Sequence, residues 1–154
     1  MFLTIHAASG LVIGKYTGSV LPAFLIGFVS HIILDMIPHD PVEMDKWKMS
    51  EVKKFMVIEF FIEFPLIAIM LAALTWSGLI TWSWVYVAAI VGAVAMDFLW
   101  GMKKLVPKCK IFGLFEKINH LSHIIFAKNY HIRWQIWLPL QVLLLVIFLL
   151  IYLW

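Results

Sequence analysis

The chain has 154 residues, of which 64% are hydrophobic and 14% are charged, and its mean hydropathy is +0.97. A soluble domain averages about 45–50% apolar and about 25% charged residues, so this composition excludes an ordinary soluble domain and predicts an integral membrane protein. The formal net charge of +3 does not predict nucleic-acid binding, because excess lysine in a membrane protein usually marks cytoplasmic loops that face anionic lipid. The length predicts one all-α membrane domain over residues 1–154, a bundle of about four to five helices.

The cysteine count argues against a disulfide or a thiolate zinc site, and the N-terminal stretch argues against a secretory signal. Cys109 is the only cysteine, so neither an intrachain disulfide nor a zinc site built from thiolates is expected. The N-terminal stretch carries His6 and has neither a basic leader nor a small-residue cleavage site, so no secretory signal is predicted.

The first predicted helix covers residues 2–16 and is apolar but short. About 20 residues are needed to cross the hydrocarbon of a bilayer, so we expect this helix to be re-entrant or a tilted, thin span. Gly10 and Gly14 would give it a face of small residues for close packing against another helix.

The second predicted helix covers residues 20–37 and carries two ionisable side chains within an apolar run. His31 and Asp35 are four residues apart and therefore lie one turn apart on the same helix face, with Cβ atoms about 5–6 Å apart. Pro38 ends the helix, so His39 falls just beyond it. Two histidines and an aspartate at a helix end can form half of a divalent-metal site. The alternative is a buried His–Asp hydrogen bond that only holds helices together.

Three longer apolar runs predict three further helices, over residues 52–75, 82–102 and 135–154. The first of these carries Glu59 and Glu63 one turn apart, followed by Pro65, which removes a backbone hydrogen bond and is expected to kink the helix. The next carries Asp97 near its end. The last is a clean apolar span.

Lysine and arginine residues gather in two of the predicted loops, one between the second and third helices and one between the fourth and fifth. If helices two to five all span, these two loops share one side of the membrane, and the positive-inside rule makes that side cytoplasmic. The ionisable residues inside the apolar segments all fall near the same side: His6, His31, Asp35, Glu59, Glu63 and Asp97. Ionisable groups in a bilayer are costly and usually mark a functional site, although acids and lysines near helix ends can also reach the interface.

The basic segment before the last helix contains a predicted amphipathic helix over residues 111–127, lying on the cytoplasmic surface. Glu116, His120 and His123 follow at helical spacing on its polar face. One interpretation is a polar face that is turned to water. The other is that this helix closes over the mouth of the bundle and lends His120 and His123 to the same metal site.

These positions define a candidate metal site and its chemistry. Imidazole and carboxylate ligands without thiolate suit Zn²⁺, Mn²⁺ or Fe²⁺, and the number of histidines and acids leaves a two-metal site open. Glu59 or Glu63 is the candidate general base. The candidate ligands are His31, Asp35, Asp97 and His120, followed by His6, His39 and His123.

The opening His6-Ala-Ala-Ser-Gly10-Leu-Val-Ile-Gly14-Lys15, followed by a helix that ends in acidic and histidine residues, resembles the YdjM-type family of bacterial inner-membrane proteins. The resemblance covers mainly residues 4–40. Members carry an L-P-D-x-D-H element after the second helix and an H-R-x-x-T-H-S element later, where this chain has Pro38-His39-Asp40 and Asn119-His120-Leu121-Ser122-His123. The resemblance implies a membrane-bound, metal-dependent hydrolase in a bacterial inner membrane.

Four functions are weighed from the sequence. A metal-dependent hydrolase acting at the cytoplasmic interface, on a phospholipid or another lipid phosphate or ester, ranks first because lysine-rich loops attract anionic headgroups. A transporter of metal ions or protons ranks lower, because a conduit would place polar residues at several depths. Ligation of haem by two histidines needs a second histidine within a clear span, and only His6 offers one. An inert interaction protein would leave the clustered acids unexplained.

Overall fold

The computed structural model describes residues 1–37, 48–106, 108–127 and 134–154. These residues form helices with short connections and no strand, which confirms the all-α prediction. In chain order the elements are α1 (Leu3–Tyr16), α2 (Val20–Asp35), α3 (Met49–Ile58), the π-helical segment η2 (Glu59–Glu63), α4 (Phe64–Trp76), α5 (Trp84–Leu105), α6 (Lys110–Ala127) and α7 (Trp134–Leu153).

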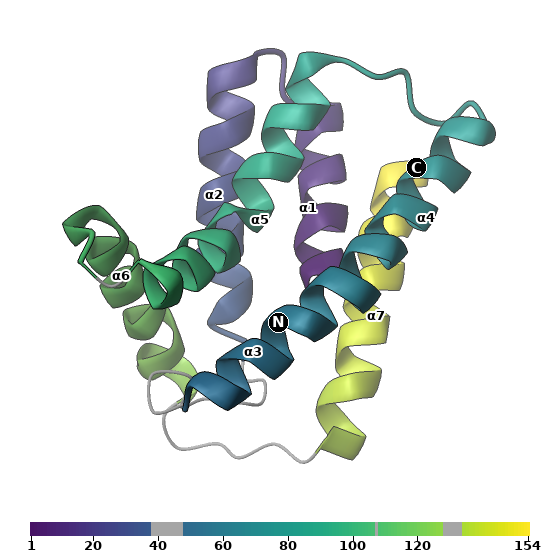
Figure 1. Ribbon diagram of the computed structural model, residues 1–154. Coiled ribbons are helices and arrows are strands. Elements are labelled where there is room, and N and C mark those ends of the chain that lie inside the picture. The colour runs from purple at the N-terminus through teal and green to yellow at the C-terminus, as the bar shows by residue number, and fades with distance from the viewer. Residues whose placement is uncertain (38–47, 107, 128–133) are drawn as a thin grey trace.

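The short helix α1 is the centre of the bundle rather than part of its outer face. It lies between α2 and α5 on one side and α4 and α7 on the other (Figure 1). Most of its residues from Leu3 to Leu11 are buried. At 1.5 Å per residue this helix is only about 21 Å long, so it is enclosed by longer helices that carry the apolar exterior.

Glycines bring the backbones of α1, α2 and α5 into direct contact. A Cβ atom at Gly10 would lie 2.7 Å from the Cα atom of Ile90, and one at Gly27 would overlap the carbonyl oxygen of Ala89. A Cβ at Gly92 would overlap the carbonyl oxygen of Phe24. Such close approach requires glycine. The packing role predicted for Gly10 is thus observed, and its partner is α5.

The third predicted helix is longer than its apolar pattern indicates. It begins at Met49 instead of residue 52, and runs continuously through α3, η2 and α4 to Trp76. The backbone N–H of Lys48 donates to the Glu51 carboxylate at 2.7 Å, a side-chain cap that stabilises a polar first turn. The π-helical segment lies directly before Pro65, which lacks an N–H and disturbs the hydrogen-bond ladder. Glu63 therefore lies well inside this continuous helix.

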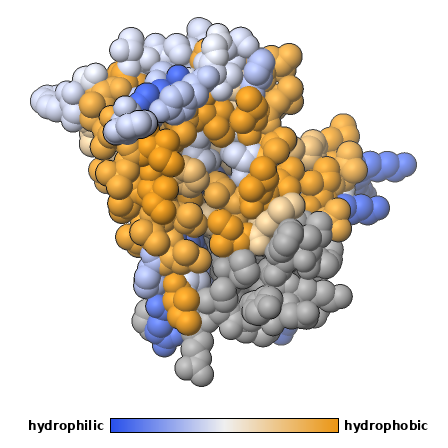
Figure 2. All heavy atoms as spheres, turned by 180° about the vertical axis from the view of Figure 1, so that it is seen from behind, coloured by the Kyte–Doolittle hydropathy of each residue, from blue (hydrophilic) through white to orange (hydrophobic). Residues whose placement is uncertain are grey.

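Three helical segments are long and apolar enough to cross a membrane: Met56–Trp76, Trp84–Lys103 and Gln135–Leu153. Their outward faces carry large apolar side chains, among them Phe61 and Ile69, which are 68% and 66% exposed. Figure 2 shows a continuous hydrophobic surface across the middle of one face of the molecule, with more hydrophilic residues at the top of the view. An apolar surface of this extent is typical of contact with lipid.

Helix α6 packs beside the lower part of the bundle, against α5 and α2 (Figure 1). The ring of Phe115 contacts that of Phe28 edge to face, with centroids 5.9 Å apart. Ile111, Leu114 and Leu121 are exposed on its outer side. The predicted apolar face therefore points away from the bundle, as expected for a helix that lies against lipid headgroups.

Candidate metal centre

Four ionisable side chains from three helices converge inside the bundle, near the end where α1 begins and α2 ends. His6 comes from α1, His31 and Asp35 come from α2, and Asp97 comes from α5. The side chains of His6 and His31 are fully buried, that of Asp35 is 1% exposed and that of Asp97 is 12% exposed. The chain thus encloses two carboxylates and two imidazoles, and Asp97 is the most accessible of the four.

Asp35 connects the two histidines through its two carboxylate oxygens. Its Oδ1 lies 3.3 Å from Nε2 of His6, and its Oδ2 lies 3.1 Å from Nε2 of His31. The amino group of Met1 also lies 3.2 Å from Oδ1. Asp35 therefore lies at ion-pair distance from both imidazole rings and from the N-terminal amino group.

The contact made by Nδ1 of His31 determines which role is left to Nε2 of the same ring. Nδ1 lies 2.6 Å from the carbonyl oxygen of Ala93. A carbonyl oxygen only accepts hydrogen bonds, so Nδ1 carries a proton and donates it. Nε2 faces two carboxylates, Asp35 at 3.1 Å and Asp97 at 3.6 Å. A neutral Nε2 would direct its lone pair at these oxygens, so the arrangement calls for a proton or a cation between them: a second proton on His31, a proton on one of the carboxyl groups, or a metal ion.

Several buried atoms of the cluster lack a hydrogen bond within the described part of the chain, although Nε2 of both histidines lies at ion-pair distance from Asp35. Nδ1 of His6 and Oδ2 of Asp97 are both buried and have no such partner there. Buried polar atoms rarely lack a partner in folded proteins, and where a protein group does not supply one, an ion or a water molecule often does. The donor set is therefore incomplete as a network of protein groups alone.

The spacing of the donor atoms fits one metal ion after a small closure. Single ligand atoms of His6, His31 and Asp97 all lie within 4.8 Å of one another. Zinc–nitrogen and zinc–oxygen bonds of about 2.0–2.2 Å allow two ligands of one ion to be at most about 4.2 Å apart. A shift of roughly half an ångström would bring the three donors within this limit. This group could hold a metal ion, and its imidazole and carboxylate donors suit Zn²⁺, Mn²⁺ or Fe²⁺.

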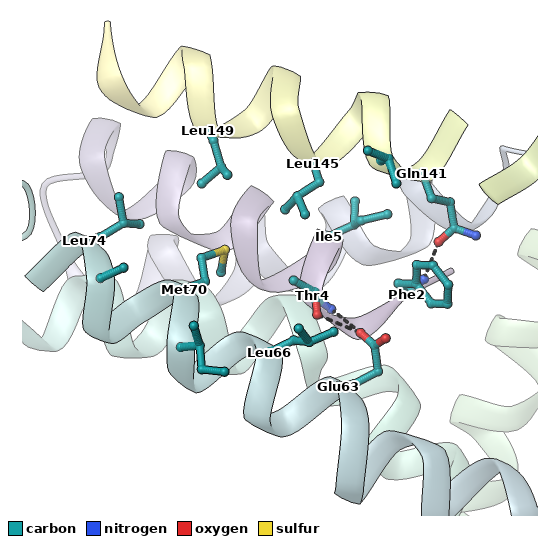
Figure 3. A pocket seen from close by; sticks show the side chains of 13 residues that line it. Phe2, Thr4, Ile5, Glu63, Leu66, Met70, Leu74, Gln141, Leu145 and Leu149 are labelled. Atoms are coloured by element: carbon teal, nitrogen blue, oxygen red, sulfur yellow. Dashed lines mark hydrogen bonds between the residues drawn. The ribbon is translucent and has the colours of Figure 1, made fainter. Parts of the chain in front are cut away.

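Glu63, predicted from the sequence as a candidate general base, is hydrogen-bonded to Thr4 at the start of α1. Its Oε2 accepts hydrogen bonds from the backbone N–H of Thr4 at 3.0 Å and from the Thr4 hydroxyl at 2.7 Å (Figure 3). Oε1 of Gln141, from α7, accepts a hydrogen bond from the backbone N–H of Phe2 at 2.7 Å. These side chains satisfy N–H groups at the start of α1 that have no partner within the helix.

The structure thus unites His6, His31, Asp35 and Asp97, and leaves other predicted residues outside its description. His39 lies in the segment 38–47, which the structure does not describe, and nothing is described of the side chains of Glu59, His120 and His123. Sequence reasoning missed the carbonyl oxygen of Ala93, because a backbone acceptor has no signature in the sequence. It also missed Gln141, a lone polar residue within an apolar run of α7 that could have been noticed as such.

Comparison with known proteins adds no relative. No protein-family model, no curated protein and no solved structure matches this chain. The resemblance to the YdjM-type family therefore stays a prediction from the sequence. The ability of the cluster to bind a metal ion is inferred from its own donor atoms.

Proposed function

We propose that the protein is a membrane-bound, metal-dependent hydrolase that acts on a phospholipid or another lipid phosphate or ester. His6, His31 and Asp97 would hold one divalent cation, with Zn²⁺ as the first candidate, and Asp35, beside Nε2 of both histidines, would position the imidazoles or coordinate the cation itself. The observation that carries the proposal is the 2.6 Å contact between Nδ1 of His31 and the carbonyl oxygen of Ala93, which leaves Nε2 facing two buried carboxylates.

Charge balance supports a cation at this point. Asp35 and Asp97 bring two negative charges into an apolar bundle, and an unpaired buried charge is strongly unfavourable. The amino group of Met1 lies 3.2 Å from Asp35 and offsets one of these charges, and a divalent cation between the carboxylates and imidazoles would offset the other and would use the lone pair of His31. In such a site a divalent cation acts as a Lewis acid and activates water for attack on an ester or phosphate.

The protein's own residues would supply orientation and proton transfer. Asp97 is the most accessible of the cluster, so water and substrate would approach from its side. Glu63 is held by Thr4 at the start of α1 and is the candidate general base, with Glu59 as the second candidate from the sequence. A general base takes a proton from water during the attack.

The proposed location is the cytoplasmic side of a bacterial inner membrane. Three segments long enough to span support the membrane setting. The chain connectivity puts Lys48 and Lys108 in connections at the same end of the bundle as the cluster, while Lys15 lies at the opposite end of α1. The positive-inside rule favours the end with more lysine as the cytoplasmic one.

A metal-ion or proton transporter is the second candidate, and the burial of the cluster favours it. Transport sites are enclosed by helices within the membrane, as His6 and His31 are here. The glycine contacts argue against it. The backbones of α1, α2 and α5 meet at Gly10, Gly27 and Gly92 and leave little room for a conduit from the cluster toward the opposite end of these helices.

Metal analysis and lipid hydrolysis by the purified full chain in detergent test the proposal. Wild type, His31→Ala and Asp97→Ala would be compared, with Glu51→Gln as a control that neutralises an exposed acid and keeps an oxygen acceptor for the backbone N–H of Lys48. We expect stoichiometric metal and hydrolysis of phosphatidylglycerol in the wild type and the control, and loss of both in the two cluster variants. Metal-free, folded wild type would overturn the metal site. Bound metal without hydrolysis, together with metal uptake by proteoliposomes, would favour the transporter.

A further inference from the structure

A cavity of about 480 Å³ lies between α1, α4 and α7. Its walls are apolar, with Leu66, Met70 and Leu74 from α4, Leu145 and Leu149 from α7, and Ile5 from α1 (Figure 3). This volume is within the range of about 300–1,000 Å³ that is typical of small-molecule sites. The cavity is elongated along the two outer helices, which suits a long and narrow apolar occupant.

Polar groups are confined to one end of this cavity. Thr4, Glu63 and Gln141 lie together there, while the remaining labelled lining residues are apolar (Figure 3). The carboxylate of Glu63 and the amide of Gln141 are held by hydrogen bonds to the first residues of α1. An occupant would therefore place a polar group at this end and hydrocarbon along the rest.

The cavity opens sideways between two helices that are long enough to span a membrane. Ile69 and Val142 line it from α4 and α7, and both are exposed, at 66% and 53%. In a bilayer this opening would face the acyl chains of lipids and not water. Hydrocarbon chains are therefore the molecules at highest concentration at its mouth.

We propose that this cavity binds an alkyl chain of a membrane lipid, with the polar part of the lipid directed toward Glu63 and Gln141. The inference rests on the proposed function in one respect, because it assigns the chain of a lipid substrate to this cavity. Thr4 precedes His6 by half a helical turn on α1, so the polar end of the cavity and the metal cluster lie at the same end of that helix. A lipid bound in this way would bring its polar group to the end of the bundle where the cluster lies, on the opposite face of α1.

Photo-crosslinking tests this assignment without relying on turnover. The full chain would be reconstituted into phosphatidylglycerol–phosphatidylcholine vesicles that contain phosphatidylglycerol with a diazirine in the middle of one acyl chain. After irradiation, adducts would be located by peptide mass spectrometry. We expect adducts to concentrate on Met70, Leu74 and Leu145 in the wild type.

Two alanines of α4 give a matched pair of variants. Ala73 lines the cavity, while its neighbour Ala72 is exposed on the same helix and is not part of the lining. Ala73→Phe would fill the cavity and reduce the adducts on Met70 and Leu145 severalfold, and Ala72→Phe would leave them unchanged. Equal thermal denaturation of the two variants would show that the loss is local.

The outcomes separate this inference from the proposed function. Adducts spread evenly over the outer faces of α4 and α7, or an unchanged pattern in Ala73→Phe, would overturn the cavity assignment even if metal and hydrolysis are found. Cross-links between two copies of the chain at the cavity would overturn it in favour of a protein occupant. Localised adducts on a chain that binds no metal would support the cavity and remove the hydrolase.

Discussion

The imidazole rings of His6 and His31 stack in parallel, with centroids 3.9 Å apart and planes inclined by 16°. Each ring directs its Nε2 toward a different oxygen of the same carboxylate, that of Asp35. Two imidazolium ions this close would repel each other strongly in a buried site. The stacking therefore favours a pair of which at least one ring is neutral and available as a metal ligand.

Asp35→Asn should weaken metal binding without abolishing it, if Asp35 acts by orienting the two histidines. Loss of an orienting partner behind a metal ligand typically costs about 10–100-fold in affinity, whereas Asp97→Asn removes a proposed ligand and should cost more. Competition against a chelator of known affinity, in detergent, measures both. An effect of Asp35→Asn equal to that of Asp97→Asn would make Asp35 a ligand itself.

His120→Ala and His123→Ala test the part of the proposed site that only the sequence supports. If α6 lends these residues to the cluster, each substitution should lower the metal content of the purified protein. Lys117→Ala, at an exposed position of the same helix, is the control. Unchanged metal content in both histidine variants would limit the site to the residues of α1, α2 and α5.

Substitutions at Glu63 separate a structural role from a catalytic one. Glu63→Gln keeps an oxygen acceptor for the backbone N–H and hydroxyl of Thr4, so it should retain thermal stability but lose hydrolysis if Glu63 is the general base. Glu63→Ala removes the acceptor and should destabilise the protein by about 1–3 kcal/mol, the cost of a buried unpaired donor. Thermal denaturation and hydrolysis would be measured on the same preparations. Full activity in Glu63→Gln would exclude the catalytic role.

Gly27→Ala should separate α2 from α5 and disturb the cluster that these helices hold. A Cβ at Gly27 would overlap the carbonyl oxygen of Ala89, and forcing an extra group into a packed contact typically costs about 1–3 kcal/mol. Gly18→Ala is the matched control, because a Cβ there meets no atom within 4 Å. The denaturation midpoint in detergent should fall for Gly27→Ala and stay unchanged for Gly18→Ala. Equal midpoints would mean that the helix contact is dispensable.

The single cysteine allows the proposed sidedness to be tested. Cys109 lies in the connection between α5 and α6, and Ser77 lies in the connection between α4 and α5, at the other end of α5. In spheroplasts of a bacterial host, an impermeant maleimide should label Ser77→Cys in a Cys109→Ser background, and should label native Cys109 only after lysis. The reverse pattern would invert the topology, and labelling of both before lysis would contradict a span by α5.

The arrangement of the candidate site was partly accessible from the sequence. The four-residue spacing of His31 and Asp35 determines that they share a helix face, because the helical repeat alone sets that geometry. Connectivity indicated that Asp97 and His6 lie near the same end of the bundle. Which side chains meet could not be derived, since it depends on the rotation of α1 and α5 about their axes.

Apolar composition and helical periodicity determined, by themselves, that this chain is helical and that it carries segments of membrane-spanning length. Both follow from local properties of each segment. Only the tertiary structure decided that α1 is the buried centre of the bundle, that Ala93 fixes the proton of His31, and that Glu63 caps α1. These features depend on contacts between residues distant in the chain, such as Thr4 with Glu63 and His31 with Ala93, which no local pattern encodes.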